Sequence, residues 1–117
     1  MNRRELKLNE YGISSKRFKE LSAFCEQYPE WVEELKKRSP AVCADAVRRS
    51  ELENKCRIIE TAALEADEEL GNFIIKSVCY EKPFWYLRDI LEIPCSQSAF
   101  YDRRRYFFYL LHKRKRM

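Results

Sequence analysis

The stretch "LRDILEIPCSQSAFYDRRRYFFYLL", residues 87–111, contains the clearest signals for helices and for a turn in this sequence. Apolar residues at helical spacing precede Pro94, and a proline disfavours the helical conformation of the residue before it, so a first helix is predicted to end at Ile93. Ser96 is a good N-cap residue for a second helix. Two helices joined by a short turn that carries one apolar residue are typical of a helix-turn-helix.

A helical wheel divides the second helix, residues 96–113, into an apolar and a polar side. The residues predicted to face inward, onto Leu87, Ile90, Leu91 and Ile93, are Ala99, Phe100, Tyr106, Phe107, Leu110 and Leu111. Those on the opposite side are Gln97, Ser98, Tyr101, Arg105 and His112, with Arg104 and Phe108 on one flank and Asp102 on the other. Arg103 falls on the inward side, where we expect it to pair with Asp89 or Glu92 because an unpaired buried charge is costly.

Positive charge is concentrated at this end of the chain. Residues 96–117 hold seven Lys and Arg residues against Asp102 alone, a local charge of +6, whereas the whole chain of 117 residues carries +4. The preceding 95 residues therefore sum to −2. Such an asymmetry favours a polyanionic partner, nucleic acid or a membrane surface, although a solubilising basic tail is the simpler alternative.

The rest of the chain also predicts helices. Only two glycines occur, strand-like alternation is absent, and apolar residues recur at helical spacing. One helix is expected to start at Ser14 or Ser15, a second around Pro29, and a fourth after a cap at Asp67. The third is long, about residues 40–66, with Leu52, Cys56, Ile59, Ala63 and Ala66 as its buried seam, and its continuity through Ser50 is left open.

These elements predict a compact all-α protein in three parts. The parts are an N-terminal helical hairpin at residues 1–38, a connecting helix at 39–66 and a helix-turn-helix region at 67–117. The hairpin is expected to be structural or to form a homodimer, because its basic and acidic residues nearly cancel. No apolar run approaches the ~20 residues of a membrane span, and no secretory signal is expected.

Catalytic and metal sites are not indicated. The five cysteines are scattered and there is one histidine, His112, so the closely spaced ligand pairs of a zinc site are missing. A glycine-rich phosphate loop and a nucleophile–base pair are also missing. We therefore predict a non-enzymatic, cytoplasmic protein without a cofactor.

The sequence favours binding to double-stranded DNA. In a helix-turn-helix the second helix enters the major groove, where side chains read base edges and cations hold phosphates. The candidate DNA ligands are Gln97, Ser98, Tyr101, Arg104 and Arg105 on the helix and Lys113, Arg114, Lys115 and Arg116 in a basic tail expected to lie beyond its packed part.

Three segments resemble small late-gene transcriptional regulators of the ArpU/RinA type from phages and prophages of Gram-positive bacteria. They are "IPCSQSAFYDRRRYFFYLL", "YGISSKRFKELSAFCEQYPEWVEELKK" and "CRIIETAALEADEEL". The resemblance implies a helix-turn-helix like the promoter-binding domain of sigma factors, acting in the cytoplasm of a bacterial host cell, with RNA polymerase as a further candidate partner. The turn at Pro94-Cys95 is longer than in sigma-like motifs, and the connection between Leu35 and Arg57 is shorter than the resemblance implies.

Two other classes of function stay open. One is a DNA-packaging component similar to a small terminase subunit, which also uses a helix-turn-helix but assembles into rings. The other is a small helical interaction or inhibitor protein whose basic end binds an acidic protein surface. The oligomeric state and binding to random duplex DNA at low salt discriminate among the three.

Overall fold

The described part of the chain is all-α, as the sequence predicts. The computed structural model describes residues 10–37 and 43–116, and no strand occurs among them. Its helices are, in chain order, α2 (Ser15–Glu26), α3 (Tyr28–Lys36), α4 (Cys43–Ala66), α5 (Gly71–Val78), α6 (Phe84–Asp89) and α7 (Gln97–Arg116).

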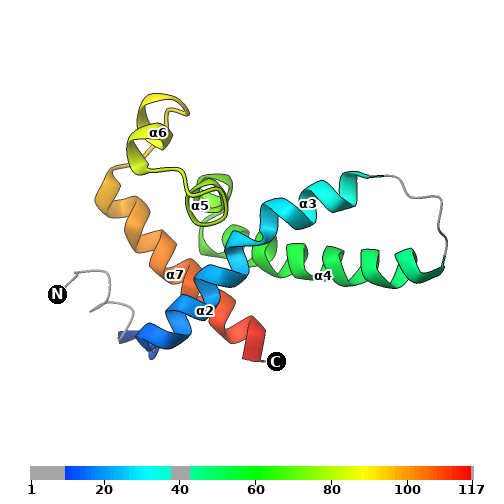
Figure 1. Ribbon diagram of the computed structural model, residues 1–117. Helices are drawn as coiled ribbons and strands as arrows, with labels where there is room; N and C mark the ends of the chain where they lie inside the picture. Colours follow the sequence, from blue (N-terminus) through cyan, green and yellow to red (C-terminus); the bar gives the residue numbers. More distant parts are fainter. Residues whose placement is uncertain (1–9, 38–42, 117) are drawn as a thin grey trace.

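Two long helices, α4 and α7, cross and make the most extensive contact in the molecule (Figure 1). α2 packs along α7, α3 runs beside α4, and α5 lies against both α4 and α7. α3 and the first half of α4 project together as an arm, whereas α6 lies at the other end of the molecule (Figure 1). The first turns of α7 therefore lie far from the arm.

One apolar core joins all of these helices. The largest fully buried side chains come from every part of the chain: Ile13, Leu21, Cys25, Ile59, Ile74, Leu87, Phe100, Phe107, Phe108 and Leu111. The hairpin, the connecting helix and the C-terminal region that the sequence distinguishes therefore share a single core.

The starts of the first two described helices follow from local chemistry. The hydroxyl oxygen of Ser14 accepts a hydrogen bond from the backbone N–H of Arg17 at 3.1 Å, so Ser14 is the N-cap of α2. Pro29 lies in the first turn of α3, where its missing N–H would have no helical partner. Both predicted starts are confirmed.

The long helix α4 passes through Ser50 without a break and ends at Ala66, as predicted. The whole predicted seam, from Leu52 to Ala66, is buried. The six residues from 46 to 51 are exposed on all sides, because that end of α4 extends beyond the core along the arm.

Asp67 and Gly71 join α4 to α5. One carboxylate oxygen of Asp67 accepts hydrogen bonds from the backbone N–H groups of Glu69 and Leu70, each at 3.0 Å, and so holds the turn between the two helices. The N-cap residue of α5 is Leu70, which makes no side-chain cap hydrogen bond, so the predicted cap at Asp67 is wrong. A Cβ on Gly71 would lie 3.3 Å from the carbonyl oxygen of Ala63. The absence of a side chain at Gly71 therefore lets α5 approach the end of α4.

Candidate nucleic-acid interface

The turn between α6 and α7 is built by backbone geometry and one buried side chain. Glu92 adopts a left-handed conformation with φ of 55°, which reverses the chain after α6. The N–H of Ile93 then bonds to the carbonyl of Leu87 at 2.9 Å, and the side chain of Ile93 is buried. The predicted break before Pro94 is confirmed, but α6 ends at Asp89, four residues before the predicted end at Ile93. Ile90, predicted to face inward, is instead 57% exposed because α6 ends one residue before it.

Ser96 caps α7, as predicted, by accepting a hydrogen bond from the N–H of Ala99 at 3.2 Å. Each residue from Ser96 to Ala99 is exposed. Two of the predicted DNA ligands, Gln97 and Ser98, therefore lie at an exposed helix start, where the first backbone N–H groups lack intrahelical partners and favour anions.

The buried side of α7 is rotated from the predicted one. Phe108, placed on the polar flank by the wheel, is 1% exposed, whereas Ala99, predicted to face inward, is exposed. The reason is that α7 packs on two neighbours: the ring of Phe18 on α2 meets Phe108 edge-on at 4.9 Å, while α4 covers the adjacent side. His112, predicted to face outward, accepts a hydrogen bond at its Nδ1 from Nε of Arg17 at 2.8 Å.

Arg105 does not point toward solvent, contrary to the prediction. It is 6% exposed, and its guanidinium pairs with the carboxylate of Asp102, one turn earlier on the same helix. Because the core side of α7 includes Phe108 as well as Phe107, the packed surface extends around the helix to Arg105. Arg105 therefore presents little of its side chain at the surface, unlike the outward-facing candidate ligand that the wheel predicts.

Arg103 takes the opposite position to the predicted one. It was expected to face inward and pair with Asp89 or Glu92, but its side chain is 53% exposed and its Nε lies 3.6 Å from Asp67. Asp89 pairs instead with its neighbour Arg88 at 2.7 Å, which lowers the pKa of the Asp89 carboxyl through a direct hydrogen bond. Arg103 is thus the arginine of the triplet that solvent reaches most easily.

Tyr101 and Arg104, two further predicted DNA ligands, pack on aromatic rings of the protein. The ring of Tyr101 lies 6.4 Å from that of Phe84 on α6. The guanidinium of Arg104 lies 5.7 Å from the ring centre of Tyr101 and 5.4 Å from that of Phe108, distances typical of cation–π contacts. Both side chains are half-buried, so a large part of each packs against the protein and only the remainder is open to solvent.

The basic end of α7 was predicted to be a tail beyond the packed part of the helix. That prediction is wrong, because this end of α7 packs against α4 and α2. Arg114 pairs with Glu65 on α4, and Nζ of Lys115 lies 3.7 Å from the ring centre of Phe24 on α2. Burial against α2 lowers the pKa of the Lys115 ammonium. Lys113 is exposed, and the side chain of Arg116 lies outside the described residues.

Three tyrosines form a feature that the sequence analysis missed. The ring of Tyr109 lies 5.0 Å from that of Tyr11 at an interplanar angle of 28°, and 6.3 Å from that of Tyr106 at 19°. We call these three rings the aromatic column. Tyr106 and Tyr109, three residues apart on one helix, could have indicated part of it, but Tyr11 is distant in sequence.

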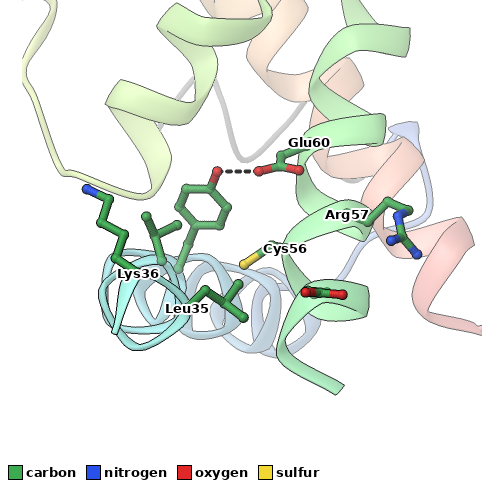
Figure 2. A pocket seen from close by; sticks show the side chains of 8 residues that line it. Leu35, Lys36, Cys56, Arg57 and Glu60 are labelled. Atoms are coloured by element: carbon green, nitrogen blue, oxygen red, sulfur yellow. Dashed lines mark hydrogen bonds between the residues drawn. The ribbon is translucent and has the colours of Figure 1, made fainter. Parts of the chain in front are cut away.

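A groove of about 390 Å³ lies between α3 and α4 (Figure 2). Its floor is formed by Tyr28, Val32, Leu35 and Cys56, and its rim by Lys36, Glu53, Arg57 and Glu60. The Tyr28 hydroxyl donates a hydrogen bond to Glu60 at 2.6 Å, and burial raises the pKa of Tyr28. Burial also raises the pKa of the Cys56 thiol to about 11, so Cys56 stays protonated near neutral pH and is a weak nucleophile.

The described residues contain neither a metal-ligand cluster nor a membrane span. Within residues 10–37 and 43–116, no group of three or more His, Cys, Asp or Glu side chains could hold a metal ion. None of the described helices is long and apolar enough to cross a membrane. The surface features described above that could contact a ligand are the start of α7, the aromatic column and the groove.

Comparisons with known proteins give no relative. No family model matches the chain, and no curated protein or solved structure matches it significantly. The resemblance to ArpU/RinA-type regulators stays a prediction.

Proposed function

We propose that the protein is a non-enzymatic regulator of transcription that binds duplex DNA with the first turns of α7 in the major groove. The observation that carries this proposal is the exposed run from Ser96 to Ala99 at the start of a long helix whose later turns are firmly packed. A rigid helix with an exposed N-terminal end suits recognition in the groove. The suggested role at phage or prophage late genes depends on the sequence resemblance.

The proposed contacts divide into base-reading and phosphate-binding groups. Gln97 offers a side-chain amide and Ser98 a hydroxyl, both of which can hydrogen-bond to base edges. Phosphates are bound by backbone N–H groups at the helix start and by Arg103. The pair between Arg103 and Asp67 is long, at 3.6 Å, and the Arg103 side chain is 53% exposed while that of Asp67 is 26% exposed, so a phosphate can compete with the carboxylate for Arg103.

The role of Arg103 revises the set of ligands expected from the sequence. Arg105 is removed from this set, because it is buried and paired with Asp102, so that little of its guanidinium is accessible to a base. Arg114 and Lys115 are removed as phosphate contacts, since each is already held by a group on α4 or α2. Gln97, Ser98 and Lys113 are kept.

Fluorescence anisotropy with a labelled random duplex tests this proposal. We expect the wild-type protein to bind at ~50 mM salt and to lose affinity steeply as salt rises, because phosphate binding releases counterions. Arg103→Ala should weaken binding severalfold. Lys19→Ala is the matched control, since Lys19 is an exposed cation on α2, which packs against the other end of α7. A wild-type protein that binds no duplex at ~50 mM salt contradicts the proposal.

A second candidate is a helical interaction protein, favoured by two exposed apolar side chains at α6. Trp85 on α6 is 55% exposed and Ile90, directly after α6, is 57% exposed, and large exposed apolar side chains are candidate protein contacts. Failure to bind duplex DNA would favour this candidate. The third, a packaging component, requires a ring, so a monomer or dimer in light scattering argues against it.

A further inference from the structure

The aromatic column has the geometry of a stacking surface for flat ligands. Its three rings are close to parallel, with interplanar angles of 28° and 19°. Tyr109 contacts both of the other rings. Tyr11 is 37% exposed, and Tyr106 is half-buried. A planar group can therefore reach the exposed part of Tyr11 or of Tyr106.

The charges around the column favour an anionic strand. Nζ of Lys113 lies 5.4 Å from the ring centre of Tyr109, and the side chain is exposed. Arg103, which is exposed, lies one turn before Tyr106, and the charge of Asp102 is offset by its pair with Arg105. Glu10 is the exposed carboxylate nearest in sequence to Tyr11 and acts against an anion there.

We infer that the aromatic column and Lys113 bind unpaired nucleotides of a single-stranded nucleic acid. A base stacks on Tyr11 or Tyr106, and a phosphate of the same strand contacts the Lys113 ammonium. Proteins that bind single strands combine aromatic platforms with a basic track in this way, and every base offers a flat face. The inference goes beyond duplex recognition, because bases within an intact duplex are not available for stacking on a protein surface.

A purely structural role for the same rings makes a different prediction. The contact between Tyr11 and Tyr109 also fixes the segment before α2 onto α7, so removing a ring affects stability in either case. A structural role alone gives no reason for the protein to distinguish a strand with bases from one without them. The comparison of two such strands therefore separates stacking from packing and from general attraction to phosphates.

The experiment uses a labelled 12-nucleotide oligo(dT) and an abasic strand with the same number of phosphates, at ~50 mM salt. We expect the wild-type protein to bind oligo(dT) roughly tenfold or more tightly than the abasic strand. Tyr106→Leu and Tyr11→Leu should each lower this ratio, the double variant should bring it close to one, and Tyr106→Phe, which keeps the ring, should preserve it. Lys113→Gln should weaken binding to both strands equally, and Glu10→Gln should strengthen it.

A wild-type ratio near one overturns the inference, and so does a high ratio that neither leucine variant lowers. Thermal melting of each variant shows whether it folds. If Tyr106→Leu does not fold, Tyr11→Leu decides, because Tyr11 precedes α2 and is more exposed. Gln97→Ala should keep the ratio. If the protein prefers oligo(dT) but binds no duplex, this inference stands and the proposed duplex function is wrong.

Discussion

The two ends of α7 carry similar residues in sequence but differ in what their side chains contact. At the start, Gln97 and Ser98 are exposed, and Arg103, whose side chain is 53% exposed, makes a long pair with Asp67 at 3.6 Å. At the other end, Arg114 pairs with Glu65 and Lys115 lies on the ring of Phe24. One end can exchange its contacts for a ligand, whereas the other would lose contacts within the protein.

This difference shows that a local excess of cations is not the same as an available positive surface. Residues 96–117 carry a net charge of +6. Arg105 and Arg114, however, face carboxylates, and Arg104 and Lys115 lie against aromatic rings. Arg103 and Lys113 also contact Asp67 and the ring of Tyr109, but their side chains are exposed, so among the described residues of α7 a polyanion would meet their charges first.

The largest effect that tests this comparison concerns the packed part of α7. Phe107→Ala and Phe108→Ala should each lower the free energy of unfolding by about 3–5 kcal/mol, because both rings are fully buried. The helical wheel, which places Phe108 on the polar flank and Phe107 inside, predicts a large effect of Phe107→Ala but a small effect of Phe108→Ala. Urea unfolding measures both, with Gln97→Ala, an exposed position, expected to change stability by less than about 0.5 kcal/mol. A small effect at Phe108 would mean that α7 is rotated differently.

A smaller effect is expected at Arg105. Arg105→Ala should destabilise the fold by about 1.5–3 kcal/mol, since a buried hydrogen-bonded charge and its aliphatic stem are lost. The affinity of the folded variant for duplex DNA should change little. Paired melting and anisotropy experiments check this. Loss of DNA affinity with unchanged stability would return Arg105 to the DNA surface.

The smallest effect is expected at Lys115. Burial lowers the pKa of its ammonium, so just below the ordinary lysine pKa the unfolded chain binds this proton more tightly than the folded one. Stability attributable to Lys115 therefore rises with pH in that range. Relative to Lys115→Met, the wild-type protein should gain stability as pH approaches 10, as measured by urea unfolding at several pH values. An opposite trend would mean that Lys115 is not packed on α2.

Much of the fold could be predicted from sequence because its causes are local. Ser14 and Ser96 cap helices, Pro29 lies in the first turn of α3, and the seam of α4 follows helical spacing. Each of these depends on residues within a few positions of one another. The exposure of Gln97 and Ser98 at the start of α7 was predictable for the same reason.

The errors at the candidate site have long-range causes. A wheel assumes one packed side, whereas α7 packs on α4 and on α2 at once, which buries Phe108 and narrows the polar side. The partners of Arg103 and Arg114 are Asp67 and Glu65, far away in sequence. The stacking of Tyr11 on Tyr109 likewise joins the two ends of the described chain. Such contacts depend on how the helices cross, which residue spacing alone does not determine.

The most direct test of the central claim is a salt titration of duplex binding for two arginine variants of α7. The logarithm of the association constant falls linearly with the logarithm of salt concentration, with a slope of about −0.9 for each phosphate contact. We predict that Arg103→Ala makes the slope shallower by about one unit, while Arg114→Ala, matched in residue type and helix, leaves it unchanged. A shallower slope for Arg114→Ala together with an unchanged one for Arg103→Ala would contradict the account.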